Sequence, residues 1–356
     1  MKKLFVFLLL TLFILGVGLA KLKVAFVYVG PVGDHGWTYA HDLGRRYIEK
    51  VFDGDITTTY IENVPDGMEA KPVIESLAKR GFNIIFTTSF GFMDATLEVA
   101  KAYPKTFFFH CSGYKTYKNM TAYFGRMYEP SFLAGIIAGM MTKSNIIGYV
   151  APIPIPEVVR ITNAFALGVK LVNPKAKVHV VWTHSWYDPA TESEAARSLI
   201  DLGADVIAQQ TDSAAPVQVA EEKGVYSIGY NSDMKKFGPK MYLTAPIWNW
   251  GVYYERVVRE VMNGTYKSEN YWGGMADGIV KLAPLSSAVP YNVRKMVRVF
   301  EEAIKRGEFH PFLGPVYDQE GKLRIKDGEI PSDAELLAMM WFVDNIVGTI
   351  PKGGGE

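Results

Sequence analysis

The chain has 356 residues, of which 49% are hydrophobic and 21% charged, and its 38 Lys and Arg nearly balance its 37 Asp and Glu. This composition is too apolar for a disordered chain and too neutral for a protein that wraps nucleic acid, so we expect a globular protein of about two domains at ~100–200 residues each. The single cysteine, Cys111, excludes an internal disulfide framework and a zinc site built on several cysteines.

The first twenty residues have the pattern of a secretory signal. Two lysines precede an uninterrupted apolar run from 4 to 15, and small residues occupy Gly18 and Ala20. We expect cleavage after Ala20. A retained membrane anchor is the alternative, because the apolar stretch is at the short limit for crossing ~30 Å of hydrocarbon. In either case the body of the chain is predicted to work outside the cytoplasm.

From Lys21 onward, short apolar strands alternate with helical segments, which is the rhythm of βαβ units and a parallel sheet. Strands are predicted at 23–29, 56–61, 83–88, 106–110 and 121–125, and helices at 37–51, 69–80 and 92–102. The pattern then starts again, with helices at 131–141, 157–172, 191–202 and 214–223, and strands at 146–150, 178–183, 205–209 and 226–230. One architecture is therefore expected twice.

A third section returns to the first half, with strands predicted at 242–245 and 278–282 and a helix at 250–262. We expect an α/β protein of two Rossmann-like lobes with parallel sheets, joined by a hinge that the chain crosses several times. The predicted N-terminal lobe takes 22–126 and 247–278, the C-terminal lobe takes 127–246 and 279–347, and 348–356 is a flexible tail. The last part of the C-terminal lobe is predicted to hold a helix at 293–306, a hairpin at 317–325 and a final helix at 333–347.

The candidate binding residues follow the strands. In open parallel sheets, ligands bind beyond the carboxyl ends of the strands, and these loops hold aromatic and neutral polar residues with a few carboxylates but no Lys or Arg. Phosphate and sulfate are therefore poor candidates, whereas flat aromatic faces suit a planar ring and Asp and Asn suit its hydrogen-bonding edge. The expected contacts are Asp34, Trp37, Ser89, Phe90, Tyr128, Trp186, Tyr187, Asp212, Asn231 and Trp248.

Several of these motifs have a second interpretation. Asp34 equally suits the N-cap of the helix that follows it. The glycines at 30, 33 and 36 do not have the spacing of a dinucleotide loop, and we interpret them as turn formers that let Asp34 and Trp37 approach the cleft. The six histidines form no zinc motif and no nucleophile elbow occurs, so no metal, cofactor or catalytic residue is predicted.

The same segments resemble the basic membrane protein family of ABC-transporter substrate-binding proteins, which includes bacterial purine-nucleoside receptors. The resemblance covers about 23–347, and its motifs include Gly-Asp-His-Gly-Trp at 33–37, Tyr-Glu-Pro-Ser-Phe-Leu-Ala-Gly at 128–135, Ser-Trp-Tyr-Asp-Pro at 185–189 and Ile-Gly-Tyr-Asn-Ser-Asp at 228–233. It implies a type I periplasmic-binding fold that closes on a small molecule and delivers it to a membrane permease. We expect a monomer that binds no nucleic acid.

In family members that bind nucleosides, the base is sandwiched between aromatic residues that match Trp37 and Trp186. The family's carboxylate for the ribose hydroxyls falls on Asn231, and a basic residue near the sugar falls on Trp248. Both departures favour a free purine base such as adenine over its nucleoside. Asp212, Asn231 and Ser89 are expected to form hydrogen bonds with the edge of the base.

Three rival functions remain. The first is a nucleoside receptor of the same family. The second is a secreted nucleoside hydrolase, for which Asp34, Asp212 and Asp233 are the carboxylates that could gather, although such enzymes usually need a metal. The third is a sensor module that passes its signal to a partner protein instead of a permease.

Overall fold

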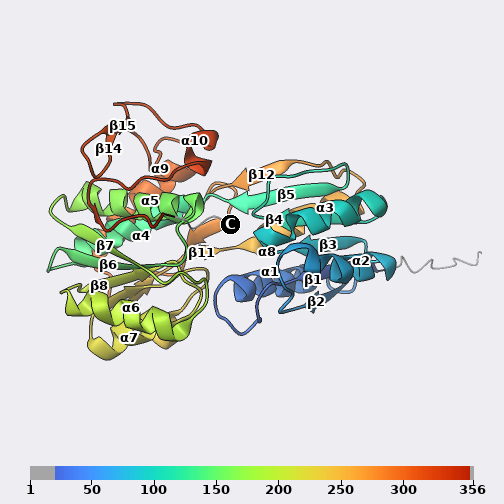
Figure 1. The fold of residues 1–356 in the computed structure, drawn as a ribbon, viewed down its shortest axis with the longest axis horizontal. Coiled ribbons are helices and arrows are strands. Elements are labelled where there is room, and N and C mark those ends of the chain that lie inside the picture. The colour runs from blue at the N-terminus through green and yellow to red at the C-terminus, as the bar shows by residue number, and fades with distance from the viewer. Residues whose placement is uncertain (1–20, 353–356) are drawn as a thin grey trace, which may run out of the picture.

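The chain folds into two lobes, each built on a six-stranded parallel sheet with helices on both faces (Figure 1). The computed structural model describes residues 21–352, so the predicted signal at 1–20 lies outside the described residues. The two sheets confirm the predicted α/β class. Strands that are apolar on both faces require this arrangement, because helices must cover each face of the sheet.

The N-terminal lobe has the strand order β12-β5-β4-β3-β1-β2. Its strands are β1 (Leu22–Val27), β2 (Ile56–Ile61), β3 (Ile84–Thr87), β4 (Phe107–Cys111), β5 (Met120–Gly125) and β12 (Asn270–Gly273), and its helices are α1 (Trp37–Val51), α2 (Lys71–Lys79), α3 (Met93–Ala102) and α8 (Trp250–Met262). Side chains alternate along β1: Val24 and Phe26 join the core that includes α1 and α8, whereas Ala25 and Val27 join the core under α2 and α3.

The C-terminal lobe repeats this plan with the strand order β10-β9-β8-β6-β7-β16. Its strands are β6 (Ile146–Ala151), β7 (Lys177–Trp182), β8 (Val206–Gln209), β9 (Tyr226–Ile228), β10 (Tyr242–Thr244) and β16 (Ile346–Val347), and its main helices are α4 (Tyr128–Met141), α5 (Pro156–Val172), α6 (Pro189–Asp201) and α7 (Ala215–Lys223). Helices α4 and α5 touch through backbone, because a Cβ added at Gly135 or Gly168 would lie 2.0 Å from a carbonyl oxygen of the other helix.

The chain passes between the lobes after β5, after β10 and after β12. Two of these passages pair as a short antiparallel ribbon of β11 (Pro246–Trp248) and β13 (Val280–Leu282). Strands β11 and β12 were not predicted from the sequence. Their few residues include Trp and Pro at positions that the pattern assigns equally to loops. The ribbon places Trp248 between the two lobes.

The C-terminal extension corrects one prediction. It contains α9 (Tyr291–Lys305) and a hairpin of β14 (Val316–Tyr317) and β15 (Leu323–Ile325), close to the expected positions. The prediction of a final helix at 333–347 is wrong after Leu337, because α10 covers only Asp333–Leu337. Residues Ile346–Val347 instead form strand β16. The apolar residues from 339 to 346 are spaced as in a helix, which explains the error.

The segment from 338 to 345 is not helical, and helix α5 provides hydrogen-bond partners for its backbone. The Asn163 side chain accepts from the N–H of Val343 at 3.0 Å and donates to the carbonyl of Trp341 at 2.7 Å. Beyond β16, the carbonyls of Gly348 and Thr349 accept from side chains of the same lobe. The described start of the expected flexible tail is therefore tied to the C-terminal lobe.

We predict that Asn163→Ala lowers the free energy of unfolding by about 1–3 kcal/mol, because it leaves two buried backbone groups without partners. Urea unfolding measures this loss as a lower midpoint. Asn292→Ala, in the exposed first turn of α9, is the control and should leave the midpoint unchanged. Equal midpoints for the two variants would show that the side chain of Asn163 does not hold the segment.

Candidate ligand-binding cleft

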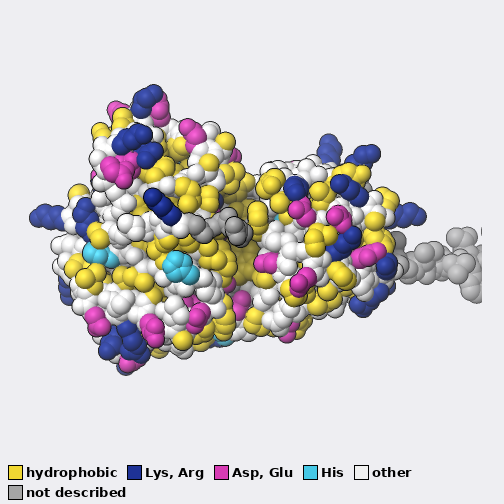
Figure 2. Space-filling view, viewed as in Figure 1, with side chains coloured by type: hydrophobic (Ala, Val, Ile, Leu, Met, Phe, Trp, Pro, Cys, Tyr) yellow, Lys and Arg dark blue, Asp and Glu magenta, His cyan; other side chains and the backbone are white. Residues whose placement is uncertain are grey.

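The loops at the carboxyl ends of both sheets meet where the lobes adjoin. Figure 2 shows the surface hollowed at this junction, with hydrophobic side chains gathered there. The loop from 30 to 36, which follows β1, contacts loops of the C-terminal lobe: the Ser232 hydroxyl donates to the carbonyl of His35 at 2.5 Å, and the ring of Phe237 lies edge-on to His35 at 4.9 Å. The lobes are therefore closed on each other.

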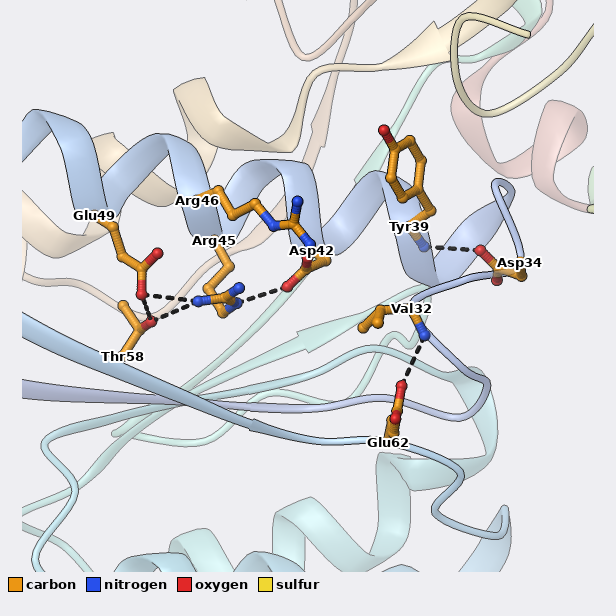
Figure 3. Close-up of polar contacts among 9 residues, drawn as sticks. All are labelled: Val32, Asp34, Tyr39, Asp42, Arg45, Arg46, Glu49, Thr58 and Glu62. Atoms are coloured by element: carbon orange, nitrogen blue, oxygen red, sulfur yellow. Dashed lines mark hydrogen bonds and ion pairs between the residues drawn. The ribbon is translucent and has the colours of Figure 1, made fainter. Parts of the chain in front are cut away.

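Asp34 caps helix α1, which begins directly after this loop. Its carboxylate accepts from the backbone N–H groups of Gly36, Thr38 and Tyr39 at 2.9–3.0 Å, and Figure 3 shows it at the first turn of α1. Burial raises the pKa of Asp34 despite these hydrogen bonds, which lower it. Gly36 is the N-cap residue of α1, and Asp34, two residues earlier, caps the helix end through its side chain.

Asp212 completes the same helix end from the other lobe. The backbone N–H of Trp37 acts to lower the pKa of Asp212, and Gly36 lies so close that an added Cβ would be 2.5 Å from the Cβ of Asp212. Only glycine permits this approach, because any side chain at 36 would collide with the facing backbone. Closure therefore depends on Gly36 and joins α1 to the C-terminal lobe.

A chain of hydrogen bonds leads from Asp212 to the ribbon between the lobes. The Asn231 amide donates to Asp212 Oδ1 at 2.7 Å, and its carbonyl oxygen accepts from the indole N–H of Trp248 at 2.8 Å. All three side chains are at most 8% exposed. Asn231 and Trp248, the two positions that depart from the nucleoside-binding pattern, are therefore bonded to each other.

Trp37 is held against a stack of three rings. Trp248, Trp250 and His41 lie nearly parallel at successive centroid distances of 4.5 and 4.6 Å. The Trp37 ring is perpendicular to all three, at 4.5–5.8 Å between centroids. The three stacked rings cover one another's faces, so their edges are what they present sideways. Trp37 therefore packs one face of its ring against these edges.

The rotation of the Trp37 ring is also fixed. Its indole N–H donates to the carbonyl of Thr88, at the end of β3, at 2.7 Å. Phe124 lies 6.3 Å away between ring centroids, and the Trp37 ring is half-buried, so part of its surface stays open. The position and the rotation of the ring are thus both fixed.

The loop after β7 brings Trp186 to the same place. The carbonyl of Trp186 accepts from the N–H of Asp212 at 2.9 Å, and its half-buried side chain packs on the core. Tyr187, 47% exposed, lies beside it on the outer side. On the N-terminal lobe, Ser89 donates to Asp66 at 2.6 Å and Phe90 is 57% exposed. Ser89 therefore already has a protein partner, whereas the side chains of Phe90 and Tyr187 are open to solvent.

Tyr128, another predicted contact, packs against a different set of residues. It begins α4 and is buried, with its ring against Trp272 and Phe312 and its hydroxyl 3.1 Å from Arg126 Nη1 and 3.3 Å from His310 Nε2. Its packing against the C-terminal extension explains this position.

Three carboxyl groups lie near one another at the junction. Burial raises the pKa of Asp212 well above its usual range, and the negative charges of Asp34 and Glu192 add to the rise. Glu192, fully buried in α6, accepts from Ser213 Oγ at 2.6 Å and from the backbone N–H of Asp188 at 3.0 Å. Each of the three groups accepts hydrogen bonds within the protein, so none of them is left free by the closed arrangement.

Sequence reasoning missed a second polar group at the junction, formed by Glu157, Gln210 and Tyr230. Gln210 follows β8 directly, Tyr230 lies two residues after β9, and Glu157 is in the first turn of α5, which follows β6. Attention to the first helical turn after each strand, and not only to the loops, would have identified Glu157. Among residues 21–352, no group of three or more His, Cys, Asp or Glu is placed to hold a metal ion.

The family of the chain follows from comparison with known proteins. Residues 21–308 match the model of the family described as "ABC transporter substrate-binding protein PnrA-like". The chain is 45% identical over 332 residues to a purine-binding protein of Brucella abortus, covering 93% of this chain and 95% of that protein. It is 40% identical over 331 residues to a putative ABC transporter glucose-binding protein of Haloferax volcanii, covering 93% and 81%.

The fold agrees with this assignment. A solved ABC-transporter solute-binding protein from Conexibacter woesei superimposes with a TM-score of 0.71 at 21% identity, covering 81% of this chain and 98% of that one. The closed pair of lobes is that of a solute-binding protein. The chain belongs to the family of basic-membrane-protein ABC-transporter substrate-binding proteins. No helix among residues 21–352 has the length and apolar character needed to span a membrane.

We predict that Gly36→Ala keeps the lobes apart, because its methyl group would collide with Asp212. Small-angle X-ray scattering, recorded with and without adenine, should give a larger radius of gyration for this variant than for wild type. Gly33→Ala is the matched control in the same loop, since an added Cβ there meets nothing within 4 Å. If Gly36→Ala scatters like Gly33→Ala and wild type, the approach of Gly36 to Asp212 does not limit closure.

Proposed function

We propose that this protein is the extracytoplasmic receptor of an ABC importer for a free purine base, with adenine as the preferred ligand. The observation that carries the proposal is the geometry of Trp37, an indole fixed on one face by three aromatic rings and on its edge by Thr88. A flat base stacked on the remaining face gains ~1–3 kcal/mol. Trp186, brought to the junction by the other lobe, is the second platform.

The bond between Asn231 and Trp248 supports a base over a nucleoside. Both ends of the Asn231 amide are already used, one by Asp212 and one by Trp248. These two bonds fix the orientation of the buried Asn231 amide, and the indole of Trp248 occupies volume beside Trp37. The sequence relative from Brucella abortus, described as purine-binding, agrees with this ligand class.

A sugar ligand is the competing function, because the relative from Haloferax volcanii is described as a putative glucose-binding protein. Isothermal titration with adenine, adenosine, guanine and glucose separates the two. We expect adenine to bind most tightly. Binding of glucose without binding of any purine would contradict the proposal, and tighter binding of adenosine than adenine would replace the base receptor by a nucleoside receptor.

We predict that Trp37→Ala and Trp186→Ala each weaken adenine binding roughly 5–150-fold, the equivalent of about 1–3 kcal/mol of stacking. Titration calorimetry measures the change. Trp341→Ala is the matched control, because this half-buried tryptophan packs in the C-terminal extension beside Arg324. An unchanged affinity in Trp37→Ala would remove the aromatic platform from the proposal.

A further inference from the structure

Glu157 is the carboxylate at the junction that the protein itself does not use. Asp34, Asp212 and Glu192 each accept hydrogen bonds from protein groups, whereas Glu157 makes no hydrogen bond or ion pair with the residues between 21 and 352. It is half-buried in the first turn of α5. Burial raises its pKa to about 7, even though the charge of Arg160 acts in the opposite direction. A buried carboxylate without a partner is costly, so a role outside folding is expected.

Glu157 belongs to the cleft side of the C-terminal lobe, because α5 follows β6 at the carboxyl end of the sheet. Burial is the main cause of the raised pKa of Cys111, at the end of β4, and the negative charge of Glu157 adds to it from the other lobe. Strands β3 and β4 pair with Thr87 opposite His110, which sets Thr88 beside Cys111. Trp37 donates to the carbonyl of Thr88 and so borders the strand ends of the N-terminal lobe, whereas Glu157 borders those of the C-terminal lobe.

A second unpaired group follows the strand that adjoins β6. Gln210 comes directly after β8, which pairs with β6, and its backbone N–H donates to the carbonyl of Val150 at 2.9 Å. Its side chain is fully buried, the side-chain carbonyl oxygen accepts from the Tyr149 hydroxyl at 3.2 Å, and Nε2 has no partner among the described residues. One acceptor and one donor are therefore unfilled on the segments that follow the neighbouring strands β6 and β8.

We propose that Glu157 and Gln210 bind the edge of the purine that carries N9–H and N3, with Glu157 accepting from N9–H and Gln210 donating to N3. This inference rests on the purine-base receptor proposed above and names the residues that make it a base receptor. A nucleoside carries its sugar on N9 and has no hydrogen there, so it cannot make the bond to Glu157. It would also leave the carboxylate buried and unpaired, which makes the discrimination strong.

The test is a thermodynamic cycle of ligand and side chain, measured by titration calorimetry at pH 8. Adenine and 9-methyladenine are each titrated into wild type and Glu157→Gln. For adenine we expect Glu157→Gln to bind roughly 10–150-fold more weakly, as for loss of a hydrogen bond to a charged group. For 9-methyladenine we expect weak binding that the substitution does not weaken further, because the hydrogen atom in question is absent.

Two further arms complete the experiment. Unsubstituted purine retains N9–H but lacks the amino group, so it should lose as much affinity as adenine on Glu157→Gln. Asp94→Asn is the matched control, since Asp94 occupies an exposed position in the first turn of α3. This variant should bind adenine like wild type. Glu157→Asp, which keeps the charge on a shorter side chain, should fall between wild type and Glu157→Gln.

The outcomes distinguish this inference from the proposed function. If wild type binds adenine and Glu157→Gln binds it equally well, or if adenine and 9-methyladenine lose affinity by the same factor, Glu157 does not accept from N9–H while the receptor function stands. If purine, unlike adenine, is insensitive to the substitution, Glu157 contacts the amino group instead and the inference is wrong. If wild type binds no purine, the proposed function itself fails.

Thermal unfolding of the ligand-free variants excludes a merely structural role. A carboxyl group whose pKa is raised by folding lowers stability at pH values above its unfolded pKa, so Glu157→Gln at pH 8 should melt at the same temperature as wild type or higher. A lower melting temperature together with uniformly weaker binding of all three ligands would assign Glu157 to folding and overturn the inference.

Discussion

The meeting of Asp212 with the first turn of α1 is the interaction on which the closed structure depends. A helix begins with backbone N–H groups that have no partner inside the helix. Asp34 satisfies three of these groups within its own lobe, and Gly36 brings the helix end against Asp212 of the other lobe. Closing the lobes therefore places the positive end of a helix beside a carboxyl group, which is favourable, and it also brings Asp34 and Asp212 together, which raises the pKa of Asp212.

The aromatic residues extend this contact through the molecule. Asp212 bonds to Asn231, Asn231 to Trp248, and Trp248 stacks on Trp250 and then on His41, which returns to α1. The path begins and ends at the same helix and passes through the ribbon that joins the lobes. Trp37 lies across the edges of these rings. The surface that meets the ligand is thus positioned by the same side chains that connect the hinge to the cleft.

The sequence predicted those features that local patterns determine. Helices α1 and α8 begin and end where the apolar spacing and flanking residues placed them, and the strand-end rule located Trp37, Trp186 and Asp212. The sequence could not show that Asp212 is hydrogen-bonded to Asn231 and packed against the start of α1, because these partners come from distant parts of the chain. The segment after Leu337 was misassigned for the same reason: its spacing suits a helix, but hydrogen bonds from Asn163 hold it extended. Glu157 was overlooked because the strand-end rule was applied to the loops and not to the first helical turn that follows each strand.

Helix α5 connects the region beyond the family match to the cleft. Its residues Arg160, Asn163, Ala166 and Lys170 line one side and hold the chain between 336 and 345, whereas its first turn presents Glu157. The family match ends at residue 308, so this C-terminal strap belongs to the part of the chain outside it. The position of α5 therefore depends on contacts with a segment that lies apart from the cleft in the sequence and outside the family match.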